Sequence, residues 1–333
     1  MIFRVGSGIA IAAALLLAVT VFGKAGRQSG SNPDGLEVLQ LRPNFYMIAG
    51  AGANISVQVG DDGVVIVDAG AASKADSVIA AIKKITSRPI RYVIDTGADA
   101  DHVGGNAALA KAGQTLFVAG GGIGLPADFL AGGASILAVE NVLRRMSAPT
   151  GKTAAFPVDA WPTETFQQPR KYMYLNGEGI EVLYQPAAHT DGDGIVFFRR
   201  SDVVVAGDIF DTTRFPVIDV AKGGTVEGEI AALNRLVDLA IPSVPIVSRE
   251  EGTLVIPGHG RVCDQLDVVE YRDMLMIIRD RIRDLIKAGR TLEQIKETSP
   301  ARGYTRRYGS DRGAWTTNDF VEAVYRSLAQ EKR

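Results

Sequence analysis

The hydrophobic positions of the chain change period repeatedly, from the alternation of a strand to the three-to-four spacing of a helix. Continuous apolar runs at 64–67 and 203–206 are typical of strands buried on both faces. Strands are predicted at 37–48, 55–59, 64–67, 92–94, 115–119, 171–175, 180–184, 194–198, 203–206 and 253–256. Helices are predicted at 71–85, from about 105, and at 138–146, 225–240, 267–288 and 319–330. Strands and helices in this order, twice over, favour two sheets packed face to face with helices outside.

The first 30 residues form a pattern of their own. Arg4 precedes a stretch without charged residues, Val5 to Gly23, and Lys24 and Arg27 follow it. A basic start before an apolar run is typical of a secretory signal peptide. The run is also near the ~18 residues at which a membrane span becomes feasible, so a retained anchor is the alternative. In both cases we expect an exported protein, periplasmic or extracellular, that meets the membrane only through this segment.

The rest of the sequence is expected to fold as one domain. We assign residues 1–30 to the signal peptide or anchor, 31–36 to a linker, and 37–333 to the folded domain, whose C-terminal helical extension covers about 264–333. Hydrophobic residues make up 46% of the chain, enough for a substantial core. The net charge of -2 argues against a nucleic-acid partner. Cys263 is the only cysteine, which excludes an internal disulfide, and we assign it no chemistry.

The three histidines of the chain occupy similar places in the pattern. His102, His189 and His259 each follow a strand-like run, in a turn rich in Gly, Asp or Pro. Loops at strand ends are where a rigid scaffold places reactive groups. Three such histidines, each beside carboxylates, are compatible with a metal site, and three separate structural residues are the alternative at this point.

Five short segments resemble the motifs of one family. Residues 96–105, TGADADHVGG, resemble the loop T-H-x-H-x-D-H-x-G-G of the metallo-β-lactamase superfamily. The other four are Val67-Asp68-Ala69-Gly70, Ala188-His189-Thr190-Asp191-Gly192-Asp193, Gly207-Asp208 and Pro257-Gly258-His259-Gly260, in the family's order. The resemblance covers about residues 36–260. It implies an α/β fold, the metallo-β-lactamase-like αββα sandwich, with its metals at one rim.

Two positions depart from the family pattern. Gly97 stands where the family has the first histidine of the loop, and Asp99 stands where it has the second. By resemblance, the first metal site therefore retains only Asp99, His189 and the bridging Asp208. The flavodiiron relatives also carry a carboxylate at the position of Asp99, and they hold iron, but they keep the first histidine.

The second metal site implied by the resemblance is complete. Its four ligands are Asp101, His102, Asp208 and His259. Two nitrogens and two carboxylates suit zinc and leave room for water. Because carboxylate-rich sites shift preference towards harder metals, iron and manganese are the alternatives. We expect one or two ions in all.

The resemblance implies metal-assisted hydrolysis, with Asp101 as both a ligand and the catalytic residue that orients the attacking water. The leading hypothesis is an exported hydrolase with one tightly bound zinc and a small-molecule substrate. One alternative is a dinuclear enzyme in which Asp99, His189 and Asp208 hold a weaker second metal. Another is a catalytically silent family member that binds a ligand or partner in the same cleft. The pattern sets neither the substrate nor the oligomeric state.

Two further residues are candidates to support the ligands. Asp68 and Thr190 are placed to accept or fix the second N–H of a metal-binding imidazole. For Asp68 the alternative is a cap at the N-terminus of the helix predicted from residue 71. The irregular region 120–169 is expected to overhang the metal rim and to set specificity.

Overall fold

Two β-sheets lie face to face in the structure, a computed structural model that describes residues 35–116, 132–243 and 252–330. In spatial order, the first sheet contains β1 (Glu37–Arg42), β2 (Phe45–Ala51), β3 (Ala53–Gly60), β4 (Gly63–Val67), β5 (Ile90–Ile94), β6 (Ser135–Val139) and β9 (Glu164–Phe166). The second contains β10 (Arg170–Leu175), β11 (Glu178–Gln185), β12 (Asp193–Phe198), β13 (Val203–Asp211) and β14 (Leu254–His259). β4, β5, β6 and β9 pair in parallel, as do β13 and β14, and the other neighbours are antiparallel.

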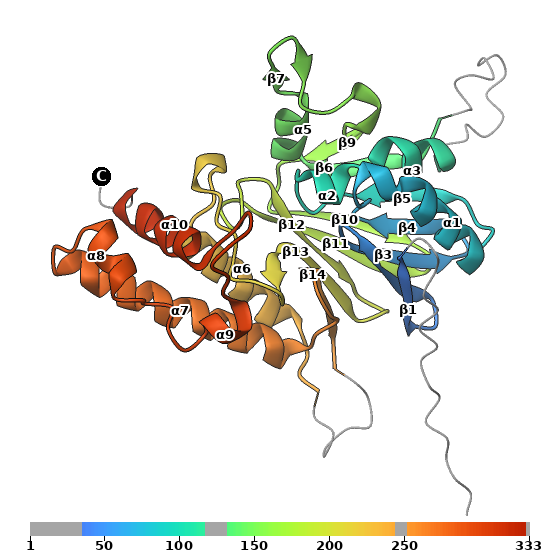
Figure 1. The fold of residues 1–333 in the computed structure, drawn as a ribbon. Coiled ribbons are helices and arrows are strands. Elements are labelled where there is room, and N and C mark those ends of the chain that lie inside the picture. Colours follow the sequence, from blue (N-terminus) through green and yellow to red (C-terminus); the bar gives the residue numbers. More distant parts are fainter. Residues whose placement is uncertain (1–34, 117–131, 244–251, 331–333) are drawn as a thin grey trace, which may run out of the picture.

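Helices cover the outer face of each sheet (Figure 1). The first sheet carries α1 (Ala75–Ile85) and α3 (Asn106–Ala112), and the second carries α6 (Val226–Leu239), α7 (Gln265–Lys287) and α10 (Thr317–Gln330). The remaining helices are α2 (Ala100–Val103), α5 (Glu140–Ser147), α8 (Leu292–Glu297) and α9 (Thr305–Tyr308), with 3₁₀ turns η1 (Ala72–Lys74), η2 (Val158–Ala160) and η3 (Val220–Lys222). The predicted αββα sandwich is confirmed.

The continuous apolar runs explain the layering. In β4, Val65 and Val67 belong to the core between the sheets, whereas Val64 and Ile66 pack with the helices outside the first sheet. In β13, Val203 and Val205 face the other sheet, and Val204 and Ala206 lie in the core formed with α6, α7 and α10. Because successive side chains of a strand point to opposite faces, a strand covered on both sides needs apolar residues at every position.

Three sequence predictions need correction or fall outside the structure. The strand predicted over 37–48 is two strands, because Pro43 and Asn44 make the turn of the β1–β2 hairpin. The helix predicted over 138–146 begins at Glu140, since 135–139 is strand β6. The strand predicted over 115–119 lies mostly outside the described residues.

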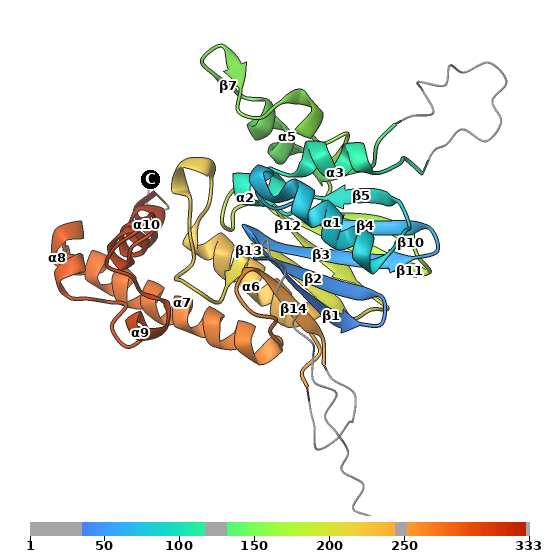
Figure 2. The same cartoon turned by 45° about the vertical axis from the view of Figure 1, so that its right-hand side comes forward.

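The part of region 120–169 that the structure describes lies beside the loops after the second sheet's strands. The small hairpin of β7 (Pro149–Thr150) and β8 (Thr153–Ala154) projects away from the sheets (Figure 2), whereas Val142 and Met146 of the preceding α5 are buried in the core between the sheets. Arg145 on α5 donates to Asp191 and to the Lys222 carbonyl. This segment therefore contacts the loop that carries His189.

The predicted N-terminal signal or anchor lies outside the described residues. Within the described ranges, no helix has both the length and the apolar character needed to cross a membrane.

Candidate metal centre

One edge of the sandwich collects the ends of strands from both sheets. Asp101 and His102 lie on α2, the single turn that follows β5. His189 lies between β11 and β12, Asp208 lies within β13, and His259 is the last residue of β14. Because strands β11, β13 and β14 run in the same direction, their C-terminal ends meet at this rim.

The complete second site of the family pattern converges in space. Nε2 of His259 lies 3.2 Å from Oδ2 of Asp101 and 3.4 Å from Oδ1 of Asp208. Nε2 of His102 lies 3.3 Å from the same Oδ1 of Asp208. Asp101, His102 and His259 could together hold a metal ion through one ligand atom each. The structure thus brings all four predicted residues of this site together.

The atoms of this cluster are left without hydrogen-bond partners. Within the described residues, Nε2 of His102, Nε2 of His259 and Oδ1 of Asp208 are buried and accept or donate no hydrogen bond. Unpaired buried polar atoms are costly, so a convergent set of them calls for a ligand. The separations also fit, since ligands ~2.0–2.1 Å from a tetrahedral zinc stand about 3.3 Å apart. The chemistry and spacing of these residues therefore suit a metal ion.

The solvent side of the cluster is formed by Asp101. Its side chain is 41% exposed, against 18% for His259, 13% for Asp208 and 2% for His102. Three of the four candidate ligands are thus embedded in the fold, and Asp101 is the most exposed. A substrate or water would approach from the side of Asp101.

His102 is oriented by a buried carboxylate. Oδ2 of Asp68 lies 2.9 Å from Nδ1 of His102, and Asp68 also accepts from the backbone N–H and hydroxyl of Thr96. The arrangement turns Nε2 of His102 towards Asp208. Asp68 has a positive φ of 62° and makes no side-chain cap to η1 or α1. Of the two interpretations of Asp68, the structure gives the partner of the imidazole.

The altered first site has a different character. Asp99, His189 and Asp208 also form a group that could hold a metal. Within it, however, Nε2 of His189 and Oδ2 of Asp99 are 2.7 Å apart, at hydrogen-bond distance, while Oδ2 of Asp208 is 4.0 Å from the ring. The Val217 carbonyl lies 2.5 Å from Nδ1 of His189 and fixes the ring. Two of these ligands are already paired with each other.

Two glycines define what the rim can accept. An added Cβ at Gly97 would meet only Oδ1 of Asp193, 4.0 Å away, and its φ is not positive. The missing first histidine has therefore left open space. At Gly258 a Cβ would lie 2.5 Å from Oδ1 of Asp208, so only glycine lets β14 pass this carboxylate.

The carboxylates of the rim favour the protonated forms of His102 and His189. Burial would lower the pKa of His189, but the hydrogen bond with Asp99 and the charges of Asp193 and Asp208 raise it to about 10. Burial likewise acts to lower the pKa of His102, and neighbouring carboxylates, Asp208 first, raise it well above its usual value. A metal entering the rim would displace these protons.

Of three further residues near the site, Thr190 has a different role from the predicted one, and Lys222 and Glu229 were not predicted. Thr190 does not hold an imidazole; its hydroxyl donates to Asp193 and shapes the loop. Lys222 reaches Oδ1 of Asp99 at 3.2 Å, and Glu229 is a fully buried carboxyl on α6. Neither stands in a local motif. The one sequence signal for Glu229 is its position on the helix stripe that is otherwise apolar, between Val226 and Ile230.

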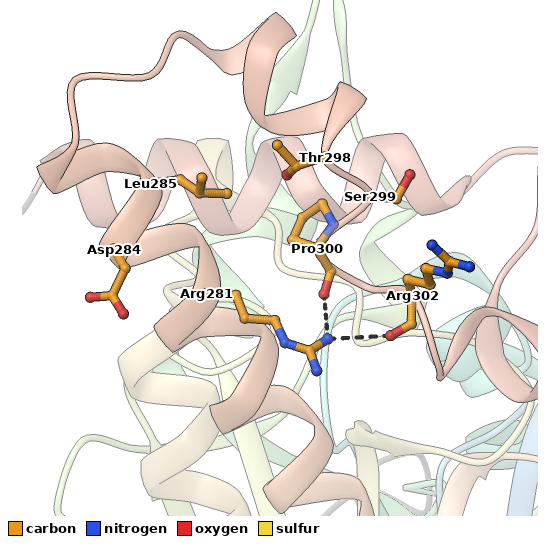
Figure 3. A pocket seen from close by; sticks show the side chains of 7 residues that line it. All are labelled: Arg281, Asp284, Leu285, Thr298, Ser299, Pro300 and Arg302. Atoms are coloured by element: carbon orange, nitrogen blue, oxygen red, sulfur yellow. Dashed lines mark hydrogen bonds between the residues drawn. The ribbon is translucent and has the colours of Figure 1, made fainter.

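A separate surface pocket lies between α7 and the segment after α8 (Figure 3). Arg281, one of its lining residues, donates to the carbonyls of Pro300 at 2.8 Å and Arg302 at 3.2 Å. Its guanidinium thus ties the C-terminal segment to α7, and we assign the pocket no chemistry.

A two-sheet sandwich with histidines and aspartates at one rim is typical of metal-dependent hydrolases. The profile of the metallo-beta-lactamase superfamily matches residues 49–316, and the chain belongs to this superfamily of metal-dependent hydrolases. No curated protein matches the sequence.

Solved structures share the fold at low identity. The sec-alkylsulfatase Pisa1 from Pseudomonas sp. is 18% identical, with a TM-score of 0.61 over 87% of this chain and 49% of its own. A metallo-beta-lactamase from Pontibacter korlensis is 16% identical, with a TM-score of 0.52 over 72% of this chain and 99% of its own. The metallo-beta-lactamase DIM-1 is 14% identical, with a TM-score of 0.51 over 72% and 97%. The chain thus spans about half the length of the alkylsulfatase, and these likenesses show the fold alone.

Proposed function

We propose that the protein is an exported hydrolase that uses one zinc ion, held by Asp101, His102, Asp208 and His259, to cleave a small-molecule substrate. One observation carries the proposal: three buried polar atoms, Nε2 of His102, Nε2 of His259 and Oδ1 of Asp208, converge without hydrogen-bond partners among the described residues. The other candidate group is partly satisfied by the pair of Asp99 and His189.

The residues around the zinc site have distinct tasks. Zinc, when bound, lowers the pKa of a coordinated water to about 7 and so supplies a nucleophile at neutral pH. Asp101, the most exposed of the four residues that would hold the zinc, would accept a hydrogen bond from an incoming water and so orient it. Asp68 holds His102 in one orientation, which keeps the ligand set rigid while substrates enter and leave.

Metal analysis and turnover test the proposal together. The purified soluble chain should carry close to one zinc and hydrolyse at least one member of a panel of β-lactam, ester, thioester and sulfate-ester probes. Asp101→Asn should lower that rate about a hundredfold or more. Two firmly bound ions in the wild type would instead indicate the dinuclear enzyme. No metal, with Asp101→Asn harmless to every measured property, would indicate the silent binding protein.

Export is proposed from the N-terminal pattern of residues 1–30. Cell fractionation of the tagged full chain should place it outside the cytoplasm, soluble or tethered to the membrane. Deleting residues 1–30 should leave a folded protein in the cytoplasm. A cytoplasmic pool of the intact full-length chain would contradict export.

A further inference from the structure

A cation of the chain itself, the ammonium of Lys222, contacts one residue of the first site. Nζ of Lys222 lies 3.2 Å from Oδ1 of Asp99, and the other oxygen, Oδ2, lies 2.7 Å from Nε2 of His189. Both carboxylate oxygens of Asp99 are therefore engaged. A metal bound there would have to break a charged pair on each side of this residue.

Lys222 is held in place by its surroundings. It ends the 3₁₀ turn η3, whose first residue follows the cap Asp219, and Nζ lies 2.9 Å from Oδ2 of Asp219. Its carbonyl accepts from the N–H of Asp191 at 2.9 Å and from Arg145 at 3.2 Å. Backbone N–H of Asp219 also donates to the His189 carbonyl at 2.9 Å. The turn is thus fixed to the loop of His189, and the ammonium is directed at Asp99.

We propose that the ammonium of Lys222 takes the place of the family's first metal ion. It neutralises Asp99, keeps that carboxylate paired with His189, and closes the first site to a divalent cation. This inference rests on the proposed function, since it explains why a two-site rim would bind one zinc.

The proposal accounts for both departures from the family loop. An ammonium needs an acceptor, and Asp99 supplies one where the family has an imidazole. Gly97 leaves open space, because a site filled by a side chain from η3 has no use for a fourth ligand from the loop. A lysine that pairs with a ligand carboxylate would also repel a divalent ion at short range.

Metal titration of lysine variants tests the proposal. Lys222→Met should let Asp99, His189 and Asp208 take up about one more zinc per chain, with the added equivalent bound about tenfold or more tightly than any second equivalent of the wild type. Lys222→Arg keeps the charge and should match the wild type. Lys222→Met with Asp99→Asn should lose the added equivalent, which separates a real site from surface binding.

Lys171→Met is the matched control. Lys171 is 34% exposed and pairs with Glu164 at 2.6 Å, much as the 39% exposed Lys222 pairs with Asp99. It should leave the zinc count unchanged. A higher zinc count in Lys222→Met than in the wild type supports the inference, and an unchanged zinc count overturns it. A wild type without any zinc would overturn the proposed function, whereas a gain in Lys222→Met would still support the role of Lys222.

Discussion

The carboxylate of Asp68 and Nδ1 of His102 are 2.9 Å apart in the buried part of the candidate metal centre. Asp68 follows β4, and His102 lies on the turn after β5. The contact therefore links the ends of two adjacent parallel strands. It also decides which nitrogen of His102 is presented at the rim.

Asp68→Asn should weaken zinc binding about 10- to 100-fold without unfolding the protein, because an amide cannot serve both Thr96 and His102 as the carboxylate does. Asparagine tolerates the positive φ of this position. Competition with a chromophoric chelator measures the affinity. Asp95→Asn is the control, since Asp95 is a buried acid after β5 whose carboxylate accepts from Asn106. Equal weakening in both variants would mean that the effect is general to the rim.

His259→Ala should remove the bound zinc, because it deletes one of the two nitrogens of the second site. His189→Ala should retain most of it, since His189 is paired with Asp99 in the other group. Metal content after gel filtration and unfolding curves of both variants give the comparison. Equal loss in both variants would show that the sites fill together.

Gly97→His combined with Asp99→His should add about one zinc per chain, because the new side chains complete a nitrogen set around His189. The open space at Gly97 and its ordinary φ allow the larger residue. Adding Lys222→Met should tighten the extra zinc further. Gly258→Ala is the contrasting variant: it should lower zinc content, since its Cβ would meet Oδ1 of Asp208. No added zinc in a folded double variant would refute the prediction.

Glu229→Gln should make the free energy of unfolding fall less steeply as the pH rises than it does in the wild type. Burial, together with the charge of Asp193, raises the pKa of Glu229 well above its ordinary value, and neither of its oxygens has a hydrogen-bond partner within the described residues. The folded state therefore holds this proton more tightly than the unfolded state. Stability is lost as the pH rises above about 4.3, by about 1.4 kcal/mol per unit until the folded-state pKa is reached.

Urea unfolding at pH 5 and pH 8 in excess chelator measures this slope. The wild type should lose stability between the two pH values, and Glu229→Gln should lose less. Glu178→Gln is the control, because Glu178 is buried but accepts from Gln58, Ser201 and the backbone N–H of Arg200. That variant should be destabilised at both pH values. An unchanged slope in Glu229→Gln would mean that the acid is solvated in the fold.

The sequence predicted the sandwich and the grouping at the rim because both leave local patterns. Apolar runs such as 64–67 mark strands buried on both faces, and each histidine follows such a strand. Strand ends on one edge must meet once the sheets form. The family loop then indicated which acids accompany the histidines.

Contacts made by long-range packing could not be predicted. Lys222 lies 123 positions from Asp99, in a short turn without any motif, and only the folding of η3 against the His189 loop brings the two together. The hydrogen-bonded pair of Asp99 and His189 likewise depends on the distance between the two side chains in the fold, which sequence spacing does not give. The turn at Pro43 could have been predicted from its residues, but the alternation on both sides concealed it.

The second site draws two ligands from each half of the sandwich. Asp101 and His102 belong to the first sheet's strand ends, and Asp208 and His259 to those of the second. A single ion would therefore act as a clasp between the two halves, in addition to direct contacts at this edge such as the pair of Asp99 and His189. At a hundredfold excess over its Kd, such an ion adds about 2.7 kcal/mol to stability. Loss of the clasp would let the two sheets separate first at the rim. Chelation should therefore increase amide exchange there before it does so in the helical layers.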